Sequence, residues 1–199
     1  MVIGLTGGIG CGKSTATAAF AARGYRTADA DRIVREEVLT DPGVLALAAE
    51  RWGGRVLAHD GALVRPAVAE IVFGSEMERL WWESVIHPRV RAIWRGRVEA
   101  APRGDWVVEV PLLFEAGLEK GFDFIVCVGA SRAVQVARVT ARGMSQAQAG
   151  LRIASQYPLE KKLKLSHAVL WNDGAHSFLD AQVEMVAQQL HPVRRGPAR

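Results

Sequence analysis

The chain has 199 residues, of which 49% are hydrophobic and 23% charged, and its formal net charge is +4 at pH 7. This composition is typical of one compact domain, or of a core with a small insertion, and it excludes disordered, collagen-like and mini-protein classes. Two cysteines make no disulfide framework, and no run approaches the ~18 apolar residues of a membrane span. The start of the chain lacks a signal-peptide pattern, so we expect a cytoplasmic protein with no membrane partner.

The first half of the chain is expected to start with a strand and a helix and then to become mostly helical. Apolar runs and glycine or proline positions define the expected elements. These are a buried strand at 2–6, a helix at 13–23 ending at Gly24, a strand at 25–28, and a helical stretch at 32–103 in which Pro42, Pro66 and Pro88 each begin a helix. We interpret the last stretch as an insertion.

The second half returns to strands alternating with helices. The expected elements are strands at 106–110 and 122–128, two helices within 131–157 separated by Gly143, a strand at 168–171 and a helix at 178–190. Ser145 and Gln148 have the spacing of a capping box. Strands that alternate with helices predict a parallel sheet covered on both faces. Residues 191–199 are expected to be a disordered basic tail.

The strongest motif lies between the first strand and the first helix. Residues 7–14, Gly-Gly-Ile-Gly-Cys-Gly-Lys-Ser, fit the pattern G-x-x-x-x-G-K-[ST]. The glycines let backbone N–H groups surround phosphate oxygens, and the start of the following helix attracts anions. Lys13 can reach the β- and γ-phosphates of a nucleotide, and the Ser14 hydroxyl can hold Mg²⁺. The motif therefore predicts a nucleotide site.

Cys11 in this loop has two interpretations. At a helix N-terminus its pKa could fall and its thiol become reactive. Alternatively it is a small residue tolerated in the loop, which uses its main chain there. We favour the second.

A phosphate-binding loop alone does not separate a kinase from a GTPase or a motor ATPase. The sequence has no Asn-Lys-x-Asp guanine motif, no Asp-x-x-Gly at switch spacing and no Leu-Ser-Gly-Gly-Gln. A helical insertion and late arginines favour a small-molecule kinase with an acceptor pocket and a lid. The alternatives are a nucleoside monophosphate kinase and a regulatory nucleotide-binding module. A nucleic-acid partner is not expected, because no basic motif is present.

Several charged residues are candidates for the chemistry beyond the loop. Asp29 and Asp31 follow a strand, where either could accept a proton or cap a helix, and spacing does not choose between them. Arg138 and Arg142 are expected on one helical face, where they could bind phosphates or face solvent. A basic helix opened by His87-Pro88 could receive an anionic acceptor. The nearby tryptophans at 81, 82 and 94 are interpreted as core of the insertion.

Taken together, these motifs resemble the dephospho-CoA kinase family over nearly all of residues 1–190. The resemblance rests on the loop with Thr15, on Asp29-Ala30-Asp31, on His87-Pro88 and on Val110-Pro111-Leu112-Leu113-Phe114-Glu115. It also rests on a later set of residues, namely Gln135, Arg138, Arg142, Arg152, Gln156, Glu160, Lys162, Asn172 and Gly174. His167 stands where the family commonly has Asp, and Trp171 where an acidic residue is common.

The resemblance implies an α/β fold with a P-loop NTPase-type parallel sheet flanked by helices. It divides the chain into a nucleotide-binding core (1–31, 105–130 and 158–190), a helical CoA-binding insertion (32–104) and a lid (131–157). It implies ATP-dependent phosphorylation of the ribose 3′-hydroxyl of dephospho-CoA, with Mg²⁺. We expect a monomer or weak homo-oligomer.

The resemblance also implies roles for individual residues. Asp31, rather than Asp29, is the implied base, and Lys13, Arg138 and Arg142 are the implied catalytic cations. His87 and Arg91 would bind the acceptor together with Asp31. The implied nucleotide contacts are Gly8, Ile9, Gly10, Cys11, Gly12, Lys13, Ser14 and Thr15, with Asn172 near the adenine and Ser14 on the metal.

Overall fold

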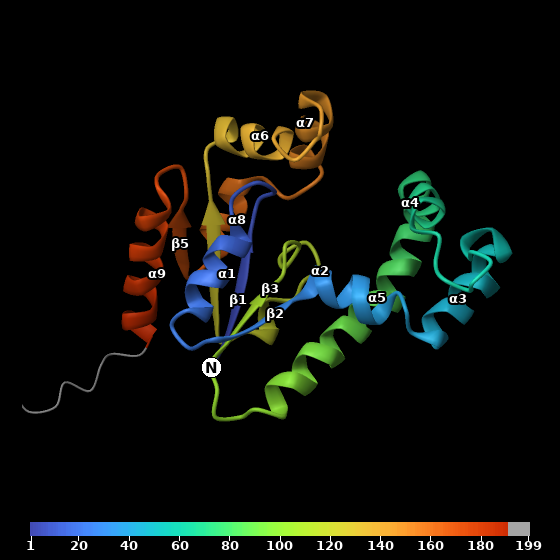
Figure 1. The fold of residues 1–199 in the computed structure, drawn as a ribbon, viewed down its shortest axis with the longest axis horizontal. Coiled ribbons are helices and arrows are strands. Elements are labelled where there is room, and N and C mark those ends of the chain that lie inside the picture. Colours follow the sequence, from blue (N-terminus) through green and yellow to red (C-terminus); the bar gives the residue numbers. More distant parts are fainter. Residues whose placement is uncertain (191–199) are drawn as a thin grey trace, which may run out of the picture. The chain divides into compact units, whose positions relative to one another are not determined.

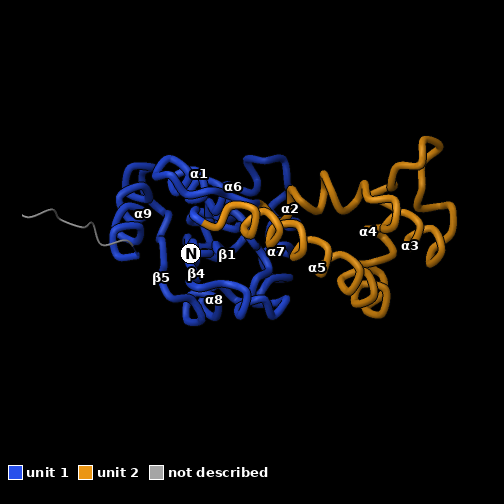
Figure 2. Tube along the Cα trace, turned by 90° about the horizontal axis from the view of Figure 1, so that it is seen from below, with its two compact units in different colours: residues 1–28, 103–199 blue, residues 29–102 orange. Residues whose placement is uncertain are grey.

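The computed structural model describes residues 1–190, which form two compact units (Figures 1 and 2). Unit 1 contains residues 1–28 and the chain from residue 103 onward, and unit 2 contains residues 29–102. The edges of the insertion were predicted at residues 32 and 104. The expected disordered tail lies outside the described residues.

Unit 1 is a parallel sheet with helices on both faces. Its strands stand in the order β2-β3-β1-β4-β5, and β1 pairs in parallel with both β3 and β4. The elements that begin in this unit are β1 (Val2–Gly7), α1 (Lys13–Ala21), β2 (Arg26–Asp29), β3 (Trp106–Glu109), β4 (Phe124–Gly129), α6 (Arg132–Thr140), α7 (Gln146–Ala154), α8 (Leu159–Leu165), β5 (Ala168–Trp171) and α9 (His176–Leu190), with a 3₁₀ turn at Glu119–Gly121.

The core of unit 1 lies between the sheet and the helices α1 and α9. Ile3 and Leu5 alternate along β1 with Gly4, and both are fully buried in one cluster with Phe20 of α1 and Val183 of α9. Gly4 faces the opposite side, towards which α8 packs on β1 and β4 (Figure 2). The apolar strands are therefore buried on both faces, as expected for a parallel sheet.

A charged cluster joins α1 to α9 at the edge of this core. The Arg23 guanidinium binds both oxygens of the Asp180 carboxylate, at 2.8 and 2.9 Å, and the Glu184 carboxylate at 2.6 Å. These contacts lower the pKa of both carboxyl groups. The helix that follows the loop is thus fixed at its C-terminal end.

Unit 2 is almost entirely helical. Its elements are α2 (Ala30–Ile33), a π-helical turn (Val34–Val38), α3 (Pro42–Trp52), a 3₁₀ turn (Gly54–Val56), α4 (Arg65–Gly74) and α5 (Glu76–Glu99). The Trp52 ring packs against Trp81 and Trp82, with ring centroids 4.9 and 5.1 Å away, and Trp94 is buried. The three tryptophans at 81, 82 and 94 are therefore core of this unit, as predicted.

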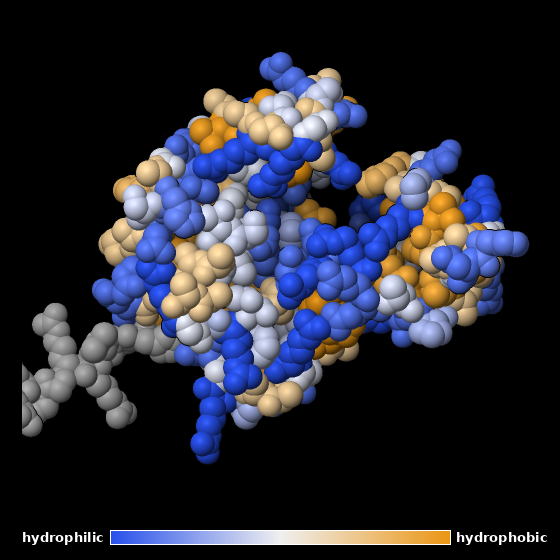
Figure 3. All heavy atoms as spheres, viewed as in Figure 1, coloured by the Kyte–Doolittle hydropathy of each residue, from blue (hydrophilic) through white to orange (hydrophobic). Residues whose placement is uncertain are grey.

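The surface of unit 2 shows apolar side chains over α3 and α4, among a mostly polar face (Figure 3). The largest exposed apolar residues of this unit are Phe73, Met77 and Leu80. They lie at the end of α4 and in the first half of α5.

Most predicted elements are confirmed, but one helix boundary is wrong and one helix was missed. Pro88 does not begin a helix: α5 runs through it from Glu76, capped by the Ser75 hydroxyl, which accepts the N–H of Glu78. Packing of a 24-residue helix outweighs the hydrogen bond that proline removes. Nearby, the Arg89 guanidinium donates to the Val85 carbonyl at 2.7 Å. The missed helix is α8.

Candidate active site

The glycine-rich loop joins β1 to α1, as the motif predicts. Gly7 and Gly12 have φ values of 147° and 92°, which side chains of L-residues rarely adopt. A Cβ on Gly7 would lie 2.2 Å from the Val128 carbonyl oxygen, and one on Gly12 would lie 2.2 Å from Nδ2 of Asn172. Both the conformation and the space therefore require glycine.

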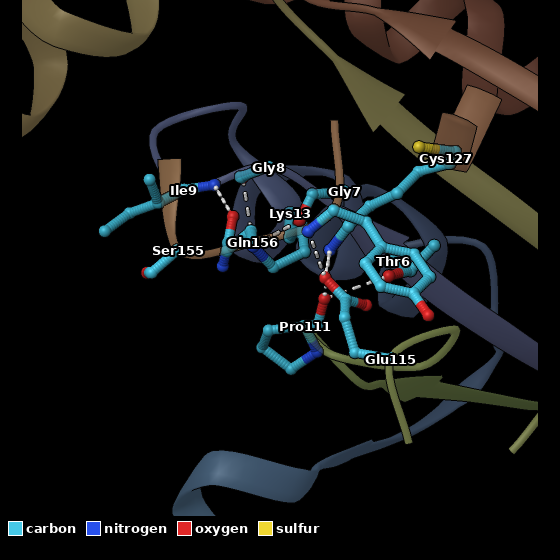
Figure 4. A network of polar contacts seen from close by, with 12 residues as sticks. Thr6, Gly7, Gly8, Ile9, Lys13, Pro111, Glu115, Cys127, Ser155 and Gln156 are labelled. Atoms are coloured by element: carbon cyan, nitrogen blue, oxygen red, sulfur yellow. Dashed lines mark hydrogen bonds and ion pairs between the residues drawn. The ribbon is translucent and has the colours of Figure 1, made fainter. Parts of the chain in front are cut away.

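Lys13 and Ser14 occupy the first turn of α1. The Lys13 ammonium donates to the carbonyl oxygens of Gly7 and Gly8, both at 3.2 Å (Figure 4). Ser14 is exposed and Thr15 is half-buried. Within residues 1–190 no side chain caps α1, as suits a helix start that binds an anion, and in its first turn the Thr15 N–H donates to the Gly12 carbonyl at 3.1 Å.

Glu109 is a functional candidate that was not predicted from the sequence. It ends β3, the strand beside β1, and its Oε2 accepts the Thr17 hydroxyl at 2.9 Å. Thr17 lies one turn after Ser14 on α1. The signal was an acidic residue closing an otherwise apolar strand, at the sheet edge where phosphate loops lie.

The chemistry of these side chains fits Mg²⁺. Mg²⁺ prefers oxygen ligands and usually keeps several waters and substrate phosphates, so it needs only one or two protein groups. The Ser14 hydroxyl and the Glu109 carboxylate are such groups. Within residues 1–190, no cluster of three or more His, Cys, Asp or Glu side chains could hold a metal ion.

Cys11 is a buried residue of the loop, which agrees with the interpretation favoured above. Its side chain is fully buried, and burial raises the pKa of its thiol despite the nearby Lys13 ammonium. A thiol that stays protonated is a poor nucleophile.

Residues far along the chain hold the loop from outside. The Asn172 amide donates to the Cys11 carbonyl at 2.8 Å, and the Arg138 guanidinium donates to the Gly10 carbonyl at 3.3 Å. The Ile9 N–H donates to Oε1 of Gln156 at 2.9 Å. The structure thus brings Asn172, Arg138 and Gln156 to the backbone of the loop.

Arg142 does not share a helical face with Arg138, contrary to the prediction. Helix α6 ends at Thr140, and Arg142 lies in the following turn, where its N–H donates to Val139. Gly143, at a φ of 94°, ends this turn. The Arg142 side chain is exposed.

Asp29 and Asp31 have different positions at the end of β2. Oδ1 of Asp29 accepts the N–H of Arg32 at 3.1 Å, so Asp29 is the N-cap of α2. Asp31 lies in the first turn of α2 and is exposed. The capping role that spacing could not assign therefore belongs to Asp29.

His87 and Arg91 lie one turn apart on α5, the helix of unit 2 that packs against α2. Both are half-buried. Burial lowers the pKa of His87, the Arg91 guanidinium lowers it further, and Glu83 opposes them. His87 is therefore neutral at pH 7.

His167 and Trp171, the two departures from the family pattern, have structural contacts. Nδ1 of His167 accepts the N–H of Ile125 at 2.8 Å, which joins the start of β5 to β4. The Trp171 ring covers Gly129, where a Cβ would lie 2.8 Å from it.

A buried ion pair lies beside the loop and was also missed. The Lys162 ammonium, whose side chain is fully buried, lies 2.7 Å from Oε1 of Glu115 and donates to the Pro111 carbonyl at 2.8 Å (Figure 4). Both residues belong to the family pattern, but nothing in their spacing along the chain indicates that they meet.

Comparisons with known proteins place this site in a family. The family model described as dephospho-CoA kinase matches residues 1–177. A dephospho-CoA kinase from Gloeobacter violaceus is 42% identical over 189 residues, which are 94% of this chain and 92% of that protein.

Solved structures with a similar fold agree with this family match. A protein from Thermus thermophilus is 31% identical, with a TM-score of 0.77 over 96% of this chain and 97% of that chain. A dephospho-CoA kinase from Campylobacter jejuni, at 22% identity, has a TM-score of 0.70 over 95% of this chain and 96% of that chain, which shows a common fold. Among the described residues, no helix is long and apolar enough to cross a membrane. With a matching family model and this level of identity over most of its length, the chain belongs to the dephospho-CoA kinase family.

Proposed function

We propose that this protein transfers the γ-phosphoryl group of ATP to the ribose 3′-hydroxyl of dephospho-CoA, giving coenzyme A and ADP, the last step of coenzyme A synthesis. The observation that supports it best is the loop of residues 7–14. Its glycine conformations and its flanking strand and helix suit a nucleoside triphosphate. Membership of the family supports the choice of acceptor. We propose that it acts in the cytoplasm as a monomer or weak homo-oligomer.

The nucleotide is held by the loop and by α1. The loop from Gly8 to Thr15 surrounds the phosphates, whose oxygens are bound by backbone N–H groups at the start of α1, and Lys13 exchanges its carbonyl partners for the β- and γ-phosphates. Asn172 fixes the loop near the adenine. Ser14 would hold Mg²⁺ together with Glu109, which contacts Thr17 one turn further along α1, and the ion would neutralise phosphate charge when bound.

Asp31 is the proposed base for the acceptor. Since Asp29 is committed to capping α2, Asp31 is left to orient the 3′-hydroxyl and to accept its proton. His87 and Arg91 lie in the same unit as Asp31 and are proposed to bind the acceptor, Arg91 through its anionic groups.

The arginines of residues 131–157 are proposed to balance the charge that develops during transfer. Arg138 already contacts the loop at Gly10, and the exposed Arg142 is in a turn that a closing lid could bring to the phosphates. We propose that residues 131–157 act as this lid and that unit 2 binds the acceptor.

The test is release of ADP from ATP and Mg²⁺, measured with and without dephospho-CoA, with adenylate, cytidylate and adenosine as control acceptors. Release that depends on dephospho-CoA and yields a 3′-phosphorylated product supports the proposal. Release with a control acceptor alone would assign another small-molecule kinase activity. Slow release of ADP at the same rate with and without every acceptor would favour a regulatory nucleotide-binding module.

Asp31→Asn tests the base. We expect turnover to fall about 10²- to 10⁴-fold while ATP binding is retained, because only proton removal is lost. Asp29→Asn is the matched control, since asparagine caps a helix as well as aspartate does. Near-normal turnover in Asp31→Asn would remove Asp31 from this role.

A further inference from the structure

The peptide between Gly8 and Ile9 is held at both of its polar atoms. The Gly8 carbonyl accepts the Lys13 ammonium and the Cys11 N–H, both at 3.2 Å. The Ile9 N–H donates to Oε1 of Gln156 at 2.9 Å (Figure 4). Since glycine adopts both signs of φ, a peptide beside Gly8 can rotate readily unless its partners prevent it. The contacts therefore select one orientation of this peptide.

Gln156 belongs to a short connection between α7 and α8 that is anchored in its own right. Its neighbour Tyr157 donates its N–H to Oε1 of Glu115 at 2.9 Å. The same oxygen lies 2.7 Å from the Lys162 ammonium. The main chain next to Gln156 is thus fixed by a buried ion pair.

This ion pair is itself joined to the strand that leads into the loop. The Lys162 ammonium and the Thr6 hydroxyl donate to the same Pro111 carbonyl, at 2.8 and 3.2 Å. Thr6 is fully buried in β1 and directly precedes Gly7. One polar network therefore holds both the start of the loop and the group that fixes Ile9 (Figure 4).

We propose that Gln156 is a positioning residue for nucleotide binding, which it controls by fixing the Gly8–Ile9 peptide. In this orientation the Gly8 carbonyl faces the Lys13 ammonium, so the lysine is placed at the loop before a nucleotide arrives. The Glu115–Lys162 ion pair holds Gln156 in reach of Ile9. The inference rests on the proposed nucleotide site and adds a determinant of ATP affinity outside the loop motif.

The test compares direct binding of a non-hydrolysable ATP analogue, by calorimetry with Mg²⁺, in the wild type and in Gln156→Ala. We expect about fivefold weaker binding, the loss typical of one ordinary hydrogen bond, with a melting temperature within about 2 °C of the wild type. Gln189→Ala, an exposed position on α9, is the matched control. Gln156→Glu keeps an acceptor of the same length, and at about 0.5 M salt, where its charge is screened, it should recover most of the affinity.

Two outcomes would overturn the proposal. Binding by Gln156→Ala as tight as or tighter than that of the wild type would mean that Gln156 does not position the loop. Gln156→Ala could instead lose affinity together with thermal stability, while Gln156→Glu recovers none of the affinity. That result would mean that Gln156 has only a structural role. A wild type that binds no ATP analogue would instead overturn the proposed function, so the two failures are distinguishable.

Discussion

Replacing Lys162 by Met tests whether the buried ion pair beside the loop stabilises the fold. Methionine is similar in length but has no charge, so Lys162→Met leaves the Glu115 carboxylate without its cation. Oε1 of Glu115 keeps the Tyr157 N–H, whereas Oε2 is buried and has no hydrogen-bond partner within the described part of the chain. The Pro111 carbonyl also loses its contact with the ammonium.

The expected cost follows from the burial of the two partners. Breaking a buried ion pair by removing one partner typically costs about 3–5 kcal/mol. The Glu115 side chain is 16% exposed, so partial hydration places the cost at the lower end, about 3 kcal/mol. For a chain of this size each kcal/mol lowers the melting temperature by about 2–4 °C, which predicts a fall of about 6–12 °C.

The assay is thermal unfolding followed by circular dichroism. Lys164→Met is the matched control, because Lys164 is exposed on the same helix, and it should melt within about 2 °C of the wild type. The double variant Lys162→Met with Glu115→Gln removes the buried charge and should recover part of the loss. A fall of less than about 2 °C for Lys162→Met alone would refute the reasoning.

Three further predictions concern single residues. Gly7→Ala should abolish folding or lower the melting temperature by more than about 10 °C, because its Cβ would lie 2.2 Å from the backbone oxygen of Val128. The control Gly150→Ala lies on helix α7, where a Cβ would meet only the Arg132 guanidinium at an ordinary contact distance of 3.9 Å, and it should stabilise the protein by about 0.5–1 kcal/mol in denaturant titration. Burial lowers the pKa of His87, so the folded state binds fewer protons than the unfolded state and the stability should fall as the pH drops below about 6.5. In His87→Gln, the denaturation midpoint should therefore depend less on pH between about pH 7 and pH 5. A pH profile identical in the two proteins would contradict this. Cys11 should react with iodoacetamide more slowly than free glutathione, since burial raises the pKa of its thiol, and labelling as fast as glutathione would show a thiolate.

The parts of the site that lie close together in sequence were predictable. The loop of residues 7–14 has a spacing that follows from phosphate chemistry, and the strands around it are apolar runs. The break at Gly143 was predicted, but the end of α6 at Thr140 was not, because Ala141 and Arg142 are compatible with a helix and only Gly143 marks the turn.

The residues that support the loop from a distance were not predictable. Lysine is almost never fully buried, so a pattern such as that of α8, with three lysines in seven residues, indicates an exposed segment. Lys162 is buried only because Glu115, from the chain after β3, meets it. The contact of Ile9 with Gln156 joins residues 147 positions apart, and no local pattern indicates it.

The interruption of the sheet by unit 2 has a consequence for how the protein folds as it is synthesised. The central strand β1 leaves the ribosome well before its neighbours, which begin only at Trp106 and Phe124. Unit 2 is continuous in sequence and is complete by residue 102, so its helices can form while β1 still lacks both neighbours. During that interval β1 is an apolar segment exposed to aggregation, and chaperone capture is expected to concentrate on its residues.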